Sequence, residues 1–322
     1  MPIIRINAQA DTPILRDHSN SRELRQTLLR RDPDAVGPVI IMTHGFKYQP
    51  GHTTACPHRS LFATHPGTRS SWPRGLGFGL MGVKEGLGIA FGWNARSTLA
   101  TALHRSRAAG HALAKLIRDV KSIWPTRPVH LISHSLGSEV VFEAIQHLPA
   151  HSVSRIILLT AASVQSRADF ALSSPAGRTC ELINITSREN DLFDFLCERL
   201  LHFGHGHATT LGRGLDAPHS VTLQLDCPIT LEHLSRLGRP IDPPQRRVCH
   251  WSAYMRRGTL RLYSDLMRYP ERFSMDLLRQ GLPAEPAPRW SRLLEVSAPL
   301  TWRRRPDRFA AYTSAGPRSA TT

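Results

Sequence analysis

The sequence predicts an α/β fold with a mostly parallel central sheet flanked by helices. Two observations lead to this fold class. Runs of β-branched and apolar residues recur along the chain, as expected for strands buried on both faces. Helical patterns separate these runs, which is typical of parallel strands joined by crossover helices. Because no internal repeat or linker interrupts the 322 residues, we expect one domain over residues 1–305 and a flexible, basic tail over 306–322.

The predicted elements follow in chain order. Strands are expected at 3–7, 38–43, 88–93, 129–133, 155–160, 180–186 and 220–226. Helices are expected from about 20 to 31, then at 98–121, 136–147, 164–172, 191–201, 231–237 and in part of 254–267. Asn20 and Glu23 form a capping-box pattern at the first helix, and Pro149 stops the helix that follows residue 136.

The stretch from 47 to 88 follows neither pattern. It is rich in glycine, proline and histidine and comes directly after the strand at 38–43. Long irregular segments inside a domain are often functional. Two interpretations stay open: a mobile apolar lid around residues 75–82, or an ordinary packed insertion. The glycine spacing is not that of a phosphate-binding loop, which excludes a nucleotide site of this kind.

The net charge of +16 is the unusual feature of the composition, with 41 Lys and Arg against 25 Asp and Glu. It reflects either a general preference for arginine or a real attraction for anionic substrates or surfaces. No nucleic-acid-binding motif accompanies it, so we expect no specific nucleic acid partner.

The five cysteines are separated and odd in number, which favours reduced thiols in the cytoplasm. We expect neither a signal peptide nor a transmembrane segment. No cofactor is expected, and no metal: the histidines at 202, 205 and 207 have loose spacing and no carboxylate or cysteine between them. The oligomeric state stays open.

The stretch 129–138 has the layout of a nucleophile elbow. An apolar strand ends in Ser133-His134-Ser135-Leu136-Gly137, and a helical pattern follows. Such a sharp turn exposes a serine hydroxyl at the edge of the sheet and needs small flanking residues. Gly137 meets this requirement, whereas Ser133 stands where glycine is usual.

A serine nucleophile needs a general base and a residue that orients the base. Ser135, Asp191 and His250 each follow a predicted strand, and reactive groups gather at the carboxyl ends of parallel strands. Asp194 is an alternative to Asp191, and other histidines near the last strand, His219 and His233, are alternatives to His250.

The oxyanion hole is expected from two backbone N–H groups. One belongs to Phe46, in the His44-Gly45-Phe46 stretch that follows the strand at 38–43, and the other to Leu136, directly after Ser135. We expect His44 to be structural, bonding the backbone of its turn, and His134 to be a packing and turn residue.

Together these segments resemble the α/β-hydrolase superfamily, close to its bacterial lipase and esterase branch. The resemblance rests on the segments 43–46, 132–137, 186–191 and 250–251 and covers about residues 36–255. It implies an α/β-hydrolase fold with an insertion after the oxyanion strand, Ser135 as nucleophile, Asp191 as acid and His250 as base.

The activity implied is hydrolysis of a small-molecule or lipid carboxylic ester through an acyl-enzyme. A thioesterase, amidase or acyltransferase would use the same triad. A different possibility is a basic binding protein on an inactive hydrolase scaffold, because a fold does not fix a function.

Overall fold

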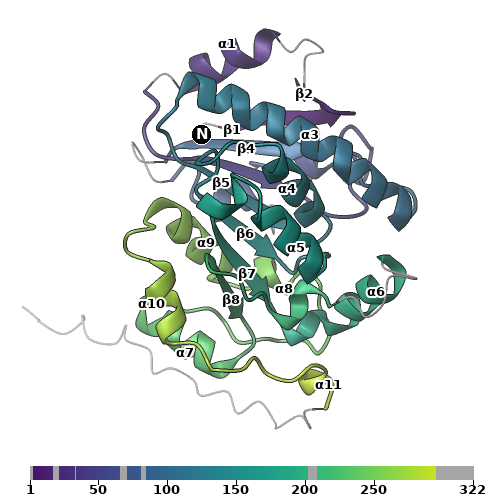
Figure 1. Cartoon of the computed structure of the whole chain (residues 1–322), viewed down its shortest axis with the longest axis vertical. Coiled ribbons are helices and arrows are strands. Elements are labelled where there is room, and N and C mark those ends of the chain that lie inside the picture. Colours follow the sequence, from purple (N-terminus) through teal and green to yellow (C-terminus); the bar gives the residue numbers. More distant parts are fainter. Residues whose placement is uncertain are drawn as a thin grey trace, which may run out of the picture.

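The computed structural model describes residues 3–16, 22–32, 34–65, 71–80, 85–201 and 209–294. Within these ranges the centre of the molecule is an eight-stranded sheet in the order β2-β1-β4-β3-β5-β6-β7-β8 (Figure 1). Only the β1–β2 pair is antiparallel; the other neighbours are parallel. This is the mostly parallel sheet that the sequence predicts.

The strands are β1 (Ile3–Gln9), β2 (Thr12–Leu15), β3 (Val39–Thr43), β4 (Leu87–Gly92), β5 (Val129–His134), β6 (Arg155–Leu159), β7 (Glu181–Thr186) and β8 (Ser220–Gln224). Every residue of β3, β4, β5 and β6 is buried, which explains why β3, β4 and β6 are mostly apolar. The sequence did not reveal β2. It is four residues long and contains Pro13, which is tolerated because the strand lies at the edge of the sheet.

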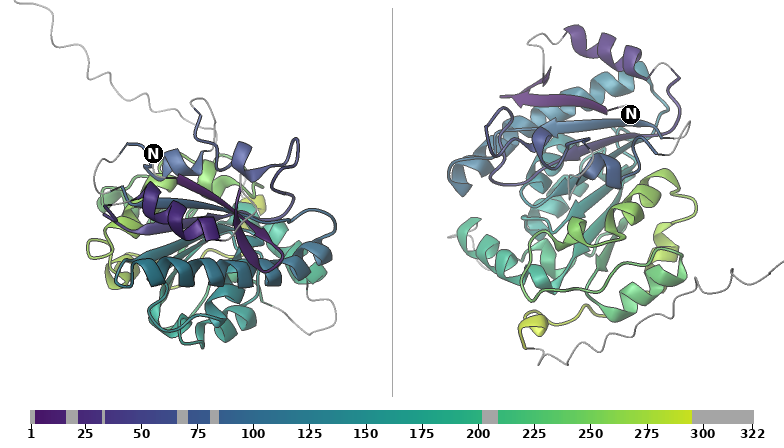
Figure 2. Two further views of the ribbon diagram at one scale, coloured as in Figure 1. Left: turned by 90° about the horizontal axis from the view of Figure 1, so that it is seen from above. Right: turned by 180° about the vertical axis from the view of Figure 1, so that it is seen from behind.

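Helices cover both faces of the sheet (Figures 1 and 2). One face carries α1 (Arg22–Arg31), α3 (Leu99–Ile123), α4 (Gly137–Gln146) and α5 (Gln165–Leu172). The other carries α2 (Trp72–Gly75), α7 (Pro228–Arg236), α8 (Ser252–Met255), α9 (Thr259–Arg268) and α10 (Met275–Gln280). The remaining helices are α6 (Asp191–Leu201) and α11 (Ser291–Leu294), with single 3₁₀ turns η1 (Pro57–Arg59), η3 (Gly177–Thr179), η4 (Arg188–Asn190) and η5 (Leu211–Arg213).

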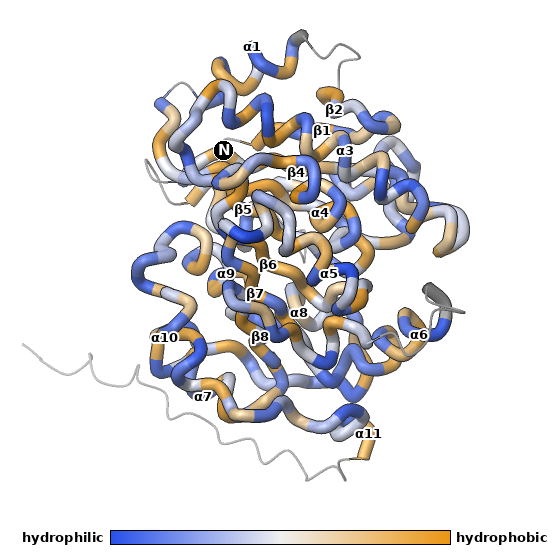
Figure 3. Tube along the Cα trace, viewed as in Figure 1, coloured by the Kyte–Doolittle hydropathy of each residue, from blue (hydrophilic) through white to orange (hydrophobic). Residues whose placement is uncertain are grey.

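Alternation along the strands divides the interior into two cores. In β3, Val39 and Ile41 face the core under α3 and α4, whereas Ile40 and Met42 face the core under α2 and α9. Apolar residues accordingly follow the strands, and hydrophilic residues dominate the connecting segments (Figure 3).

Part of the insertion is packed against the core, whereas Leu80 is 72% exposed. Phe62, Trp72 and Phe78 are fully buried in the core under α9. At Gly75 a Cβ atom would lie 2.3 Å from a methyl carbon of Leu260, so α2 lies directly against α9. Residues 81 and 82 of the suggested lid lie outside the described residues, as do the expected tail at 306–322 and the histidines at 202, 205 and 207.

All five cysteines are buried free thiols. Among the helices in the described ranges, none is both long enough and apolar enough to cross a membrane.

Candidate active site

Ser135 lies in a strained turn between β5 and α4. Its φ of +53° is in the left-handed region, which costs a residue with a side chain about 1–3 kcal/mol. The surrounding structure holds the turn in place. The Ser135 N–H donates to the Leu159 carbonyl (3.0 Å), and the Ser135 carbonyl accepts from the Ser138 hydroxyl (2.8 Å) and the Ala162 N–H (3.1 Å). The elbow geometry expected from the sequence is therefore present.

Two glycines allow the loop after β3 to contact this turn. A Cβ atom on Gly45 would lie 2.7 Å from the Cβ of Ser135 and 3.3 Å from the backbone nitrogen of Leu136. A Cβ atom on Gly137 would lie 2.7 Å from the His44 carbonyl oxygen. The backbone before Phe46 and the backbone after Ser135 thus lie against each other, as an oxyanion hole made by both would require.

Ser133 fits where glycine is usual. It is fully buried, and its Cβ lies 3.4 Å from the position a Cβ would take on Gly137. Its hydroxyl has no hydrogen-bond partner among the described residues. The turn therefore accepts this serine sterically but leaves one buried hydroxyl unpaired.

His44 fixes the loop after β3. Its Nε2 accepts a hydrogen bond from the Trp93 N–H (3.1 Å), so the ring proton is on Nδ1, which donates to the Gly45 carbonyl (2.9 Å). The ring also stacks on the Trp93 indole. Burial lowers the pKa of His44 to about 4, so the ring stays neutral as these bonds require. The structural role expected for His44 agrees with these contacts.

His250 lies in the loop before α8, and β5 and β6 hold this loop. Its carbonyl accepts from His134 Nε2 (3.0 Å) and from the Thr160 hydroxyl (3.4 Å). Its ring stacks on Phe193 of α6 with centroids 4.6 Å apart. Burial lowers the pKa of His250 well below its usual value, and the neighbouring His134 contributes to this to a smaller extent. The imidazole is therefore neutral at pH 7.

Asn190, rather than Asp191, contacts the His250 ring. The distance from Asn190 Oδ1 to His250 Nδ1 is 2.6 Å. Asn190 Nδ2 donates in turn to Asp194 Oδ1 at 2.9 Å. The Asn190 N–H₂ group thus donates to Asp194, and the amide oxygen faces His250. The proton of His250 is then on Nδ1, and Nε2 is left as a free base.

Asp191 points elsewhere, which differs from the expectation that it orients His250. Its Oδ1 pairs with Arg188 (3.2 Å), and its Oδ2 accepts the Trp290 N–H (2.5 Å). Asp194 does not reach His250 directly either; it acts only through Asn190. Burial raises the pKa of Asp194 to about 7, and the nearby Asp191 adds to this.

Asn190 was not predicted from the sequence, because only an aspartate was expected to orient the base. The signal was present: Asn190 and Asp194 are four residues apart, the spacing that brings side chains together on a helix. The two alternative bases do not lie at Ser135. His233 Nε2 bonds the Leu277 carbonyl at 3.1 Å. His219 directly precedes β8, at the amino end of this strand, whereas Ser135 follows the carboxyl end of β5.

A family model matches part of the chain. A family described as "Alpha/beta hydrolase of unknown function (DUF900)" matches residues 17–166, which include the loop after β3 and the Ser135 turn. Over these residues, which are just under half of the chain, the sequence is similar to an α/β-hydrolase family. The match ends before β7, so it does not include Asn190 or His250.

Other similarities are more distant. "Transmembrane and coiled-coil domain-containing protein STS1" of Oryza sativa subsp. japonica is 36% identical over 124 residues, which are 34% of this chain and 18% of the rice protein. The chain thus matches under a fifth of that relative's length.

Two solved structures are also similar. The Bacillus licheniformis lipase BlEst2 in its mature form has a TM-score of 0.37 and 16% identity, covering 59% of this chain and 84% of its own. Esterase PE8 has a TM-score of 0.30 and 12% identity, covering 48% of this chain and 69% of its own.

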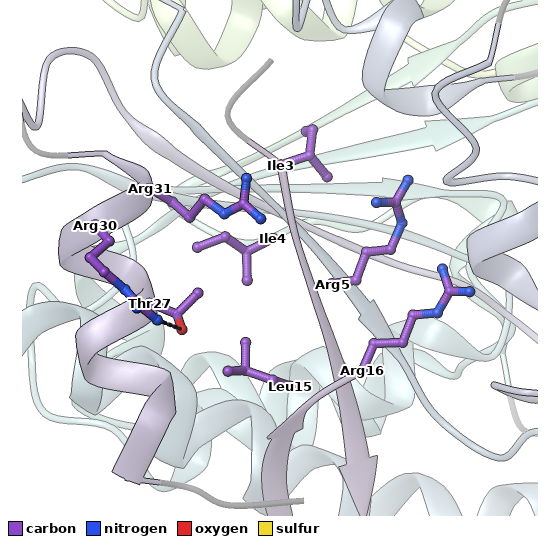
Figure 4. Close-up of a pocket in the computed structure, with 8 residues that line it drawn as sticks. All are labelled: Ile3, Ile4, Arg5, Leu15, Arg16, Thr27, Arg30 and Arg31. Atoms are coloured by element: carbon purple, nitrogen blue, oxygen red, sulfur yellow. Dashed lines mark hydrogen bonds between the residues drawn. The ribbon is translucent and has the colours of Figure 1, made fainter. Parts of the chain in front are cut away.

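A separate basic cavity of about 490 Å³ lies at the β2–β1 edge of the sheet, between β1, β2 and α1 (Figure 4). Four arginines line it: Arg5, Arg16, Arg30 and Arg31. Arg5 and Arg16 extend to the same side, and Arg30 bonds the Thr27 hydroxyl (3.4 Å). Part of the net positive charge is thus concentrated at one place.

Proposed function

We propose that the chain is a serine hydrolase of carboxylic esters, with Ser135 as nucleophile, His250 as general base and Asn190 as the residue that orients the base. The strained turn at Ser135 carries the proposal. A non-glycine residue keeps φ at +53° only where its surroundings impose it, and such strain clusters at active sites. Contact with the Gly45 loop supports the assignment of the oxyanion hole.

The chemistry follows from the hydrogen-bond network. His250 Nε2 takes the Ser135 proton as the hydroxyl oxygen attacks the ester carbonyl, while Nδ1–H stays bonded to Asn190 Oδ1. The N–H groups of Phe46 and Leu136 stabilise the tetrahedral oxyanion. His250 then protonates the leaving alcohol, and water clears the acyl-enzyme by the same steps in reverse.

An amide in the orienting position has a consequence for the rate. Asn190 fixes the tautomer of His250 but brings no charge next to the imidazolium that forms during the reaction. The nearest carboxylate in this network, Asp194, acts through the amide, one hydrogen bond further away. We therefore expect slower turnover than in a triad with a direct carboxylate.

Exposed apolar side chains next to His250 support an ester with an apolar acyl or alcohol group. Trp251 and Met255 are 46% and 54% exposed, and the Trp251 ring lies 6.4 Å from that of His250. Such side chains can contact the apolar part of a bound substrate. Thioesters, amides and an acyl acceptor other than water are compatible with the same groups.

The second candidate function is binding of an anionic ligand without catalysis, and the arginine-lined cavity favours it. Four guanidinium groups around one cavity attract phosphate or carboxylate groups. This cavity and the Ser135 site lie at different places on the sheet, so the two candidates can be tested separately.

Labelling with a fluorophosphonate tests the proposal. We expect the wild type to be labelled and to hydrolyse an activated short-chain ester, and Ser135→Ala to lose both. Ser163→Ala is the matched control, because Ser163 is also a buried serine after a strand and its hydroxyl has no partner among the described residues. Labelling that persists in Ser135→Ala contradicts the proposal. A wild type that is inert but binds polyanions in a salt-dependent way favours the binding protein.

A further inference from the structure

Three side chains that the proposed reaction does not use converge on the outer face of α3 and α4. His111 lies on α3, and Glu143 and His147 lie one turn apart on α4 and its end. Their ligand atoms all lie within 4.8 Å of one another. Both imidazole Nε2 atoms approach the same carboxylate oxygen, Glu143 Oε1, at 3.5 Å for His111 and 3.2 Å for His147.

These separations match the edges of a tetrahedral metal site. Zinc binds histidine nitrogen and carboxylate oxygen at 2.0–2.2 Å, so neighbouring ligand atoms around one ion lie about 3.3 Å apart. The two nitrogen–oxygen distances, 3.5 and 3.2 Å, are close to this value. The two rings are stacked, with centroids 4.2 Å apart.

The surrounding structure holds the three groups in this arrangement. A Cβ atom on Gly110 would lie 2.3 Å from the Cβ of Glu143, so this glycine lets α3 come close enough for His111 to reach α4. Arg167 of α5 donates to Glu143 Oε2 at 2.6 Å. Because Arg167 occupies that oxygen, Oε1 is the one directed at the histidines, as expected of a metal ligand whose second oxygen is fixed by a neighbour.

Glu143 is the most buried of the three groups. Its side chain is 13% exposed, whereas those of His111 and His147 are 44% and 40% exposed. An ion can therefore enter from solvent, and the carboxylate that receives it is partly shielded.

We propose that His111, Glu143 and His147 bind a divalent transition-metal ion of the zinc class. Three protein ligands leave the fourth position to water. The ion joins α3 to α4, the helix that begins directly after the Ser135 turn. Its role is to clamp the two helices together, so the site is expected to affect stability and not the chemistry at Ser135.

Calorimetric titration of the whole chain with zinc chloride tests this proposal. We expect the double variant His111→Gln/His147→Gln to bind one zinc equivalent fewer than the wild type. His104→Gln is the matched control on α3, because His104 is exposed on the same helix. Comparing stoichiometries also separates this site from any binding by the histidines at 202, 205 and 207, which are unchanged in both variants.

Two further measurements complete the test. Zinc at about 100 times its Kd should raise the Tm of the wild type by about 5 °C, and this rise should be absent in the double variant. Cobalt(II) should give the visible bands of a tetrahedral site without a thiolate charge-transfer band. Equal zinc stoichiometry in the wild type and a folded double variant overturns the proposal, as does a cobalt spectrum that Glu143→Gln leaves unchanged.

Discussion

Replacing Asn190 by alanine separates the two candidates for the residue that orients His250. The substitution removes the 2.6 Å hydrogen bond to His250 Nδ1 and the 2.9 Å bond to Asp194. The bond to His250 becomes charge-assisted once the imidazolium forms, and such bonds contribute about 1.5–3 kcal/mol. At 1.36 kcal/mol for each factor of ten, kcat/KM should fall roughly 10- to 150-fold.

The assay compares kcat/KM for an activated ester among the wild type, Asn190→Ala and Asp191→Asn. Asp191 pairs with Arg188, and both side chains are about 2–3% exposed, so loss of its charge should lower the free energy of unfolding by up to about 3–5 kcal/mol. At a temperature where all three proteins are folded, Asp191→Asn should retain most of its activity. The reasoning is refuted if Asn190→Ala keeps the wild-type kcat/KM while Asp191→Asn loses it.

Two other substitutions give independent predictions. Gly45→Ala places a Cβ 2.7 Å from that of Ser135, so we expect a loss of about 1–3 kcal/mol in denaturant unfolding together with loss of fluorophosphonate labelling; normal labelling would contradict the contact. Burial raises the pKa of Asp194 from 3.8 to about 7. The folded protein therefore binds the carboxyl proton of Asp194 more tightly than the unfolded chain does. The protonated carboxyl thus stabilises the fold at low pH, and this stabilisation is lost as the pH rises from about 4 to 7. The difference in unfolding free energy between the wild type and Asp194→Asn should therefore decrease across that range, and a flat difference would show that Asp194 titrates normally.

The parallel sheet and the order of its elements along the chain were predictable, because strands buried on both faces are rich in apolar residues. β3 and β6 each contain four consecutive apolar residues, which burial on both faces of a sheet explains best. β2 has no such apolar run, because an edge strand of four residues needs few apolar positions.

The strained turn at Ser135 was predictable from the elbow pattern, but the partners of the side chains around His250 were not. Ser135 and His250 remain the predicted nucleophile and base. The 3₁₀ turn η4 decides whether residue 190 or residue 191 faces His250. The outcome also depends on which groups elsewhere in the fold bond the side chain that faces away. Asp191 turns toward the Trp290 amide, 99 residues further along the chain, and no local pattern shows this contact. The cluster of His111 with Glu143 was invisible for the same reason, since its members lie on different helices.

His134 connects the two halves of the proposed catalytic machinery. It is the residue directly before the nucleophile, and its ring N–H holds the backbone of the loop that carries the base. Burial lowers its pKa to about 4, so the ring is neutral at pH 7. A displacement of the His250 loop would therefore break a hydrogen bond to the residue next to the nucleophile. Redesign of the segment before α8 would succeed only if it keeps that carbonyl in place.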